Sequence, residues 1–273
     1  MKAFLLALQF LTIIPVRISG TVEERELGKS AAWYVVVGIL QGAILLAVDY
    51  AMGNVFHPDI VAALLVLALI VTNGAFHLDG LADTADALAV KSCGDPEADR
   101  TKRLSVMKDP ATGPIGVTVL VMVLLLKYLC IRSSANLLPF TYYSTLVAMP
   151  MISKWSMVVA MFHGGAARKD GLGRIFLEGV RLPQLAAATL MFLLPIALLV
   201  FKWGRFGDID PLFFYPALLG GCYILTRAWV SFCNNRFGGL TGDTFGALSE
   251  GMELIFLMVV LAWSRLSISF ATA

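Results

Sequence analysis

The sequence predicts an all-α membrane protein, a polytopic bundle of about seven transmembrane helices plus a short N-terminal interfacial helix. Of the 273 residues, 58% are hydrophobic and only 15% are charged, and the mean hydropathy is +0.80. A soluble domain is usually about a quarter charged. Apolar stretches of about twenty residues also recur along the chain. No low-complexity segment or clear repeat divides it, so we expect one integral-membrane domain over residues 1–273.

The first element is a short apolar segment, Phe4–Val16, which we expect to be helical. It resembles a signal peptide, with Lys2 followed by an apolar core. However, Ile18 would occupy the −3 position for cleavage after Gly20, where small residues are favoured. The segment is also too short to cross a bilayer comfortably. We therefore expect it to stay with the protein and to lie in the interface or pack against the bundle.

Seven longer apolar segments follow, and each is a candidate span. They are Ala31–Met52, Ile60–Phe76, Gly113–Ile131, Thr141–Phe162, Leu185–Phe201, Leu212–Phe232 and Met252–Phe270. Most lysines and arginines outside them lie in the N-terminal segment and in the loops after the second, fourth and sixth spans. The positive-inside rule places these loops in the cytoplasm. They can therefore contribute to one site.

Composition also excludes some classes. A net charge of +2 is too small to indicate a nucleic-acid-binding protein. The four cysteines have no metal-ligand spacing, and a disulfide framework is not expected in this class of chain. We interpret them as small buried or interfacial residues: Cys93, Cys130, Cys222 and Cys233.

The stretch "HLDGLADTADAL" carries three carboxylates at the end of the second span. In a helix, Asp79, Asp83 and Asp86 occupy positions i, i+4 and i+7 and share one face. Like charges at this spacing repel, and the repulsion is less screened near hydrocarbon. A divalent cation would relieve it, and hard oxygen ligands suit Mg²⁺. The alternative is a solvated helix end, with Asp79 as its cap. His77 either orients an aspartate or binds phosphate, or is an interfacial hydrogen-bonding residue.

Three further polar segments belong to the loops on the same side. "MKDPATGPIGV" places Lys108 and Asp109 before a turn whose backbone N–H groups suit phosphate. "NNRFGGLTGDTFGALSE" is rich in glycine, and Thr241 or Asp243 could cap the helix that follows. "HGGAARKDGLGRIFLEGVR" is basic, for an anionic substrate or for lipid headgroups. Together the segments suit Mg²⁺-dependent pyrophosphate chemistry at a membrane surface.

At these residues the sequence resembles the cobalamin synthase family, the adenosylcobinamide-GDP ribazoletransferases or cobalamin 5'-phosphate synthases. The motifs are "HLDGLADTADAL", "MKDPATGPIGV", "DGLG" and "GGLTGDTFGA", in this order, with "LQFLTIIPV" near the N-terminus. The resemblance implies a multi-pass enzyme of the cell inner membrane that requires Mg²⁺. It would join adenosylcobinamide-GDP to α-ribazole or α-ribazole 5'-phosphate, giving adenosylcobalamin or its 5'-phosphate and GMP. The expected partners are membrane lipid and other enzymes of the cobalamin pathway. Binding to nucleic acid is not expected.

The resemblance also suggests roles for individual residues. The expected metal ligands are Asp79, Asp83, Asp243 and Glu250. Asp86 and Asp109 are the candidates for accepting the proton of the attacking hydroxyl, or for completing a second metal site. The expected substrate-binding residues are His77, Lys108, Arg174, Arg236, Gly239 and Gly242.

Two other functions would also use acidic residues in membrane helices. A CDP-alcohol phosphotransferase also uses Asp-rich helices and Mg²⁺, but its motif spacing is absent here. A cation-coupled transporter would use the aspartates as ion sites. Transporter sites tend to lie near the bilayer midplane, whereas these carboxylates cluster at the ends of spans. The sequence therefore favours catalysis at the cytoplasmic surface.

Overall fold

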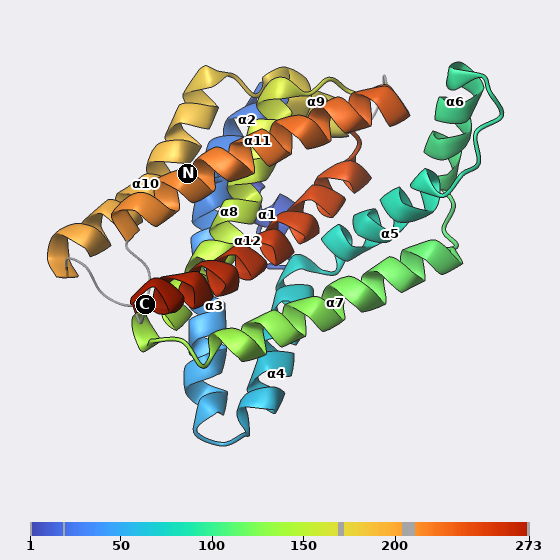
Figure 1. Cartoon of the computed structure of the whole chain (residues 1–273). Coiled ribbons are helices and arrows are strands. Elements are labelled where there is room, and N and C mark those ends of the chain that lie inside the picture. The colour runs from blue at the N-terminus through green and yellow to red at the C-terminus, as the bar shows by residue number, and fades with distance from the viewer. Residues whose placement is uncertain (1, 19, 169–171, 204–210, 272–273) are drawn as a thin grey trace.

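The computed structural model describes residues 2–18, 20–168, 172–203 and 211–271, and within them it contains helices and no strand (Figure 1). The helices are α1 (Lys2–Leu11), α2 (Glu24–Ser30), a 3₁₀ turn (Ala31–Trp33), α3 (Tyr34–Gly53), α4 (Pro58–Asn73), α5 (Phe76–Leu88), α6 (Pro96–Val106), α7 (Pro114–Ser134), α8 (Pro139–His163), α9 (Leu172–Gly179), α10 (Leu182–Trp203), α11 (Pro211–Phe237) and α12 (Gly242–Ala271). The predicted all-α class is confirmed.

Each predicted span corresponds to a helix, but the count of seven spans is not confirmed. In the described part of the chain, four stretches are long and apolar enough to cross a membrane: Glu24–Gly53, Pro114–Ser134, Pro139–His163 and Gly242–Leu266. Two bent pairs raise the number to six if each pair is one span. One pair is α4 with α5, at 89°, and the other is Gly173–Gly179 with Leu182–Leu198, at 91°.

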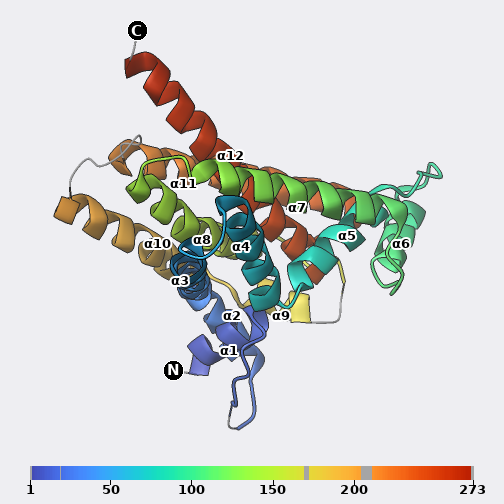
Figure 2. The same cartoon turned by 90° about the horizontal axis from the view of Figure 1, so that it is seen from below.

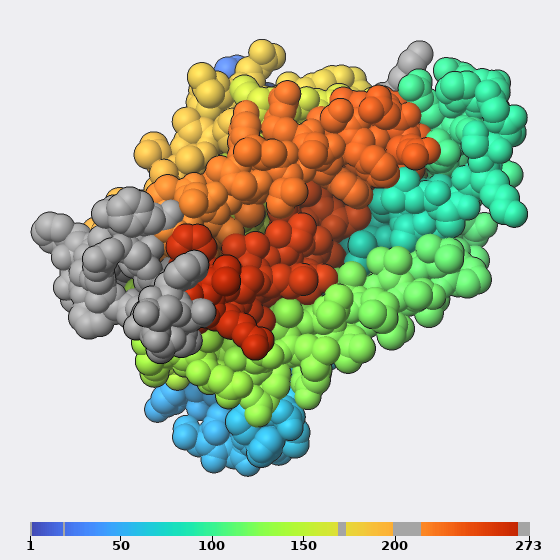
Figure 3. All heavy atoms as spheres, viewed as in Figure 1, coloured from blue at the N-terminus to red at the C-terminus, as the bar shows by residue number. Residues whose placement is uncertain are grey.

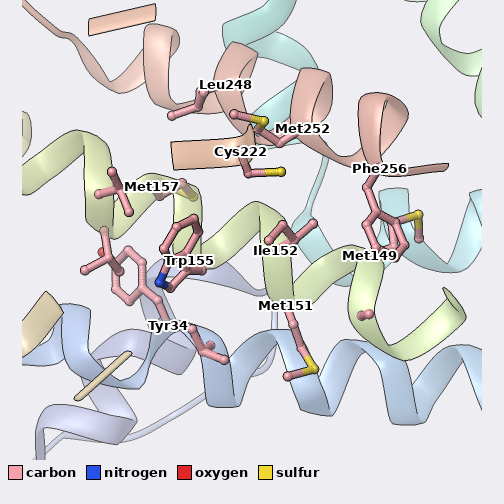
Figure 4. Packing of buried hydrophobic residues seen from close by; sticks show 14 of the residues in the cluster. Tyr34, Met149, Met151, Ile152, Trp155, Met157, Cys222, Leu248, Met252 and Phe256 are labelled. Atoms are coloured by element: carbon pink, nitrogen blue, oxygen red, sulfur yellow. The ribbon is translucent and has the colours of Figure 1, made fainter. Parts of the chain in front are cut away.

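Helix α8 lies at the centre of the bundle. In the most apolar 18-residue stretch of α8, 89% of the residues are buried, whereas in that of α7 only 22% are buried. Figure 4 shows Ile152 and Met157 of α8 beneath Leu248 and Met252 of α12, with α3 on the opposite side. Apolar residues on every side of a helix are typical of such a central position.

Glycines bring α3 and α8 into close contact. A Cβ atom on Gly38 would lie 2.7 Å from the carbonyl oxygen of Pro150, and one on Gly42 would lie 2.7 Å from the Cα of Val147. Small residues let helix backbones approach one another, which strengthens packing where lipid provides no hydrophobic drive. Larger side chains at either position would force the two helices apart.

The outer helices carry the apolar surface of the bundle. Figure 3 shows α11, α12 and α7 side by side across one face. Large apolar side chains on these helices are exposed, among them Val121, Leu125, Ile224 and Met258. Exposed apolar residues on long apolar helices fit contact with lipid.

The N-terminal helix is shorter than predicted. It ends at Leu11, not near Val16, and its buried side of Leu6, Ala7, Leu8 and Leu11 packs against the bundle. The next residues leave the helix, and the backbone N–H of Ile13 donates to the carbonyl of Thr72 on α4. The segment packs against α2 and α3, which is one of the two placements expected for it (Figure 2).

The loops after the second, fourth and sixth predicted spans meet in one place. The guanidinium of Arg103 on α6 donates to the carbonyl of Arg236 at the end of α11, at 3.3 Å. The N–H of Leu240 donates to the carbonyl of Gly165, in the loop after α8, at 2.8 Å. These contacts join three loops that are far apart in the sequence, as a single site requires.

Candidate functional site

The site begins at the sharp bend between α4 and α5. Gly74 and Ala75 both have left-handed backbone angles, with φ of 61° and 59°. A left-handed alanine costs roughly 1–2 kcal/mol, so the surrounding packing must hold it in place. The bend turns α5 by 89° from α4 and directs its aspartate face toward the beginning of α12.

Two glycines let α5 and α12 cross at very short range. A Cβ atom on Gly80 would lie 2.7 Å from the carbonyl oxygen of Asp243, and one on Gly246 would lie 2.9 Å from that of His77. Backbones this close bring the "HLDG" and "TGD" motifs together. Gly80 and Gly246 therefore have a packing role, since a side chain at either position would separate the helices.

A cavity of about 560 Å³ lies beside this crossing, between α1, α5, α8, α9 and α12. Asp79 and Asp243 line it, together with Arg168 and Arg174. Asp83 lies one turn farther along α5, within electrostatic reach of Asp79, Asp86 and Asp243. The cavity therefore joins two carboxylates and two guanidiniums from four segments of the chain.

Thr241, and not Asp243, caps the beginning of α12. The Thr241 hydroxyl accepts a hydrogen bond from the backbone N–H of Thr244, at 3.2 Å, and the Thr244 hydroxyl accepts one from the N–H of Thr241, at 2.8 Å. This reciprocal pair is a capping arrangement. The Asp243 carboxylate accepts a hydrogen bond from the Thr241 hydroxyl and lies 3.9 Å from Arg168 Nη2. The Asp243 side chain therefore does not cap α12, and it lines the cavity instead.

Asp86, a predicted proton acceptor, has a structural partner. Its carboxylate accepts hydrogen bonds from the backbone N–H groups of Gly113, at 2.6 Å, and Gly116, at 2.8 Å. It therefore satisfies donors at the start of α7, where a negative charge is also favoured. Both glycines are needed, because a Cβ atom on either would clash with this carboxylate.

Four other predicted residues do not line this cavity. Asp109 forms a turn, accepting a hydrogen bond from the N–H of Ala111, and Lys108 beside it is exposed. The guanidinium of Arg236 lies 5.9 Å from the centre of the Phe232 ring. Gly239 has a φ of 152°, and its backbone packs against the loop after α8. The structure thus places these residues around the site rather than in it.

The remaining predicted substrate-binding residues do line the cavity: His77, Arg174 and Gly242. Arg174 lies 3.3 Å from Glu178 and 3.6 Å from Glu24, so its charge is shared with two carboxylates. Gly242 borders open space, because no atom lies within 4 Å of a Cβ built on it.

Glu250, a predicted metal ligand, lies inside the helix bundle and not at the cavity. Its carboxylate is 2.5 Å from Lys127 Nζ, which is also 2.7 Å from Glu253. Lys154 Nζ lies 3.4 Å from Glu253. All four side chains are buried, so each charge requires its partners.

His77 connects this buried ionic cluster to the cavity, which it lines. The Nδ1 atom of His77 lies 3.1 Å from the Ser249 hydroxyl and 3.5 Å from Lys154 Nζ. Our reading of the sequence missed Lys127, Lys154 and Glu253. The available signal was an ionisable residue within an apolar span, which is rare and usually has a partner.

The described residues contain no group of three acidic, histidine or cysteine side chains that could hold a metal ion by themselves. The carboxylates of Asp79, Asp83 and Asp243 are neighbours, but they do not form a closed protein cage. Mg²⁺ usually keeps several waters and binds one or two carboxylates plus substrate phosphates. The donor set at the cavity is compatible with that incomplete mode of binding.

Outside the spans, Asp99 stabilises the hairpin that leads into α6. The Ser92 hydroxyl and the N–H of Cys93 both donate to its carboxylate. These hydrogen bonds lower the pKa of Asp99 to about 2. Asp99 also lies 3.9 Å from Arg103, which contacts the carbonyl of Arg236. Through this chain of contacts, the α6 hairpin is connected to the end of α11.

The chain is similar to known proteins over nearly its full length. The chain is 34% identical to an adenosylcobinamide-GDP ribazoletransferase of Geotalea daltonii, over 96% of this chain and 98% of the relative. It is 37% identical to one of Pseudomonas putida, over 94% and 98%, and 30% identical to one of Thermodesulfovibrio yellowstonii, over 98% of both. No solved structure shows significant similarity.

The family comparison covers all the elements that build the cavity. The model of the cobalamin-5-phosphate synthase family matches residues 3–261, from α1 through most of α12. This range includes the α5–α12 crossing, the Asp79 and Asp243 carboxylates and the loop after α8. By this match and by the full-length relatives, the chain belongs to the cobalamin-5-phosphate synthase family.

Proposed function

We propose that this protein joins adenosylcobinamide-GDP to α-ribazole or α-ribazole 5'-phosphate, releasing GMP. The names of its full-length relatives support this transfer. The structural observation that carries it is the pairing of Asp79 and Asp243 on one cavity with Arg168 and Arg174. Neither a CDP-alcohol phosphotransferase nor a cation-coupled transporter is supported by the comparisons.

In the proposed reaction, a hydroxyl oxygen of the ribazole attacks the phosphorus attached to cobinamide. A new O–P bond forms, the bond from that phosphorus to the oxygen of GMP breaks, and GMP leaves with those electrons. Arg168 and Arg174 are suited to hold the negative phosphate oxygens, because a guanidinium presents a fork of donors. Since Asp79 and Asp243 would hold the metal, the hydroxyl proton would pass through water to their neighbour Asp83.

Mg²⁺ is part of the proposal. Asp79 and Asp243 would hold it with substrate phosphate, and Asp83 would contribute through charge or through water. A bound Mg²⁺ would neutralise the charge that develops on the departing GMP. The like charges gathered on α5 support this assignment, because Asp83 faces three other carboxylates within electrostatic reach.

We also propose that the protein lies in the cell inner membrane, in contact with lipid, with the cavity facing the cytoplasm. The candidate spans support a membrane protein, and the basic loops that meet at the cavity support this orientation. Reporter fusions after Arg100 and Gly239 should both report a cytoplasmic location. A periplasmic result at either would contradict the orientation. Association with other enzymes of the pathway belongs to the same proposal.

The decisive experiment uses the purified full-length protein with both substrates. GMP and the cobalamin product should appear together, separated by chromatography, and both should require Mg²⁺ and α-ribazole. Asp243→Asn should abolish both products while the protein remains folded. Release of GMP without α-ribazole, or full activity after chelation of the metal, would contradict the proposed chemistry.

A further inference from the structure

Two kinds of side chain line the cavity. The charged set, called here the charged side, is Asp79, Asp243, Arg168 and Arg174. The apolar set, called here the apolar side, is formed mainly by Phe10, Phe76, Met157, Met161, Phe176 and Phe245. These apolar residues come from five helices, α1, α5, α8, α9 and α12, so the apolar side depends on how these helices pack together. Phosphoryl transfer requires the charged side alone, and the apolar side needs another explanation.

The Phe10 ring borders the cavity and rests on the Phe176 ring. The centres of the Phe10 and Phe176 rings are 4.5 Å apart, with their planes tilted by 43°. Phe176 is buried, whereas Phe10 is 37% exposed and borders the cavity. A ring supported on one side by another aromatic ring is well placed to contact a planar ligand.

Two methionines of α8 complete this surface. Met157 and Met161 are four residues apart, on one face of the helix, and both are buried. Methionine is polarisable and contacts aromatic rings favourably. Figure 4 shows Met157 on α8, below Leu248 of α12. The central helix of the bundle thus provides the innermost part of the apolar side.

The two substrates differ in what they would present to such a surface. Guanine carries donors and acceptors along its edge, and burying them without partners is costly. The base of α-ribazole is a methylated benzimidazole, with no exocyclic amine or carbonyl. Apart from the charged residues assigned to the phosphates and the metal, the polar side chains that line the cavity among the described residues are Gln9, His77 and Thr241. Gln9 is exposed, and the Thr241 hydroxyl caps α12. The apolar side therefore suits benzimidazole better than guanine.

The size of the cavity points to the same substrate. Its volume of about 560 Å³ lies in the range of small-molecule sites, which is roughly 300–1,000 Å³. A nucleoside fits such a space, whereas the corrin macrocycle of the other substrate is much larger.

We infer that this cavity is the nucleoside site, in which the base of α-ribazole contacts the exposed rings of Phe10 and Phe76 and its ribose faces Asp79 and Asp243. The larger corrinoid substrate then approaches the charged side from outside the cavity. This assignment rests on the proposed function, and it identifies which substrate the cavity takes.

The first test removes the aromatic ring of Phe10. Binding of α-ribazole to the purified full-length protein in detergent is measured by calorimetry, without the second substrate. Phe10→Leu should raise the Kd for α-ribazole roughly two- to tenfold, the usual range for loss of an aromatic contact. The Kd for GMP should stay the same. The matched control is Phe56→Leu, since Phe56 is 42% exposed and lies in the turn between α3 and α4, away from the cavity.

The second test fills the cavity. Gly242→Ala adds a methyl group that meets no protein atom within 4 Å, so the fold should tolerate it. Because Gly242 lines the cavity, the methyl group should weaken α-ribazole binding and raise the KM for α-ribazole. Gly251→Ala is the matched control: it lies on the same helix, with equally open surroundings, and does not line the cavity.

The outcomes separate this inference from the proposed function. If Phe10→Leu and Gly242→Ala weaken GMP binding and leave α-ribazole binding unchanged, the cavity holds the guanine nucleotide and the inference is wrong. Unchanged binding of both ligands would also overturn it. In either case the wild-type protein would still form cobalamin. If the wild-type protein forms no cobalamin from both substrates, the proposed function itself fails.

Discussion

Replacing Lys127 by methionine should destabilise the protein by about 3–5 kcal/mol, the usual cost of removing one partner from a buried ion pair. Lys127 Nζ lies 2.5 Å from Glu250 and 2.7 Å from Glu253, and these three side chains are 3%, 4% and 0% exposed. The variant leaves two buried carboxylates with one remaining ammonium, that of Lys154. Methionine keeps most of the side-chain volume, so the loss reflects charge more than packing.

A double variant tests the pairing itself. Lys127→Met combined with Glu250→Gln removes one charge of each sign and leaves Lys154 and Glu253, which are 3.4 Å apart. The double variant should therefore be less destabilised than the sum of the two single variants. The expected difference is about 1–3 kcal/mol, as is usual for directly coupled residues.

The assay is reversible unfolding of the purified protein in mixed detergent, followed by circular dichroism at increasing fractions of denaturing detergent. The free energy of unfolding is compared among wild type, both single variants and the double variant. Strict additivity, or a loss below 1 kcal/mol for Lys127→Met, would refute the argument that these charges depend on one another.

The same variants decide between the two roles of Glu250. If its carboxylate serves only the ion pair with Lys127, Glu250→Gln should lower stability while Mg²⁺ still raises the unfolding temperature as in wild type. If Glu250 is a metal ligand, the shift caused by Mg²⁺ should shrink in this variant. Asp79→Asn provides the comparison, because Asp79 lines the cavity and a smaller Mg²⁺ shift is expected there.

Three further predictions concern single positions. Gly246→Ala should lower the free energy of unfolding by about 1–3 kcal/mol and reduce turnover, because the new methyl group would lie 2.9 Å from the carbonyl of His77. Wild-type stability in unfolding experiments together with a wild-type rate of product formation would contradict this. Asp86→Ala should destabilise the start of α7 by roughly 0.5–2 kcal/mol, because it removes the acceptor for the N–H groups of Gly113 and Gly116. Amide exchange at the start of α7 should become faster, and unchanged exchange would contradict this role of Asp86. The pKa of Asp99 is lowered in the folded protein, so its contribution to stability is complete above about pH 4 and is lost as the pH falls toward 2. Asp99→Asn should remove this loss of stability, measured as the protection of the α6 amides from hydrogen exchange over the same pH range.

Much of the architecture could be predicted from the sequence because it depends on local properties. Apolar length specifies helices in a bilayer, since every backbone polar group there must be satisfied within a helix. The imbalance of lysine and arginine between loops predicted that three of them share one side, and the contact between Leu240 and Gly165 brings two of these loops together. The spacing of Asp79 and Asp83, and the "TGD" triplet with Asp243, identified acidic groups of one site.

Only the tertiary structure decided which partner each polar group has. Asp86 and Asp79 share a helix face, yet Asp86 meets the start of α7 while Asp79 meets the cavity. Glu250 follows Asp243 on α12 by seven residues, but it lies deeper in the bundle and pairs with Lys127. The spans have similar apolar compositions, so the sequence does not specify which helices pack together. That choice depends on close approach at glycines such as Gly80 and on the bend before α5, and both exist only once the helices are packed.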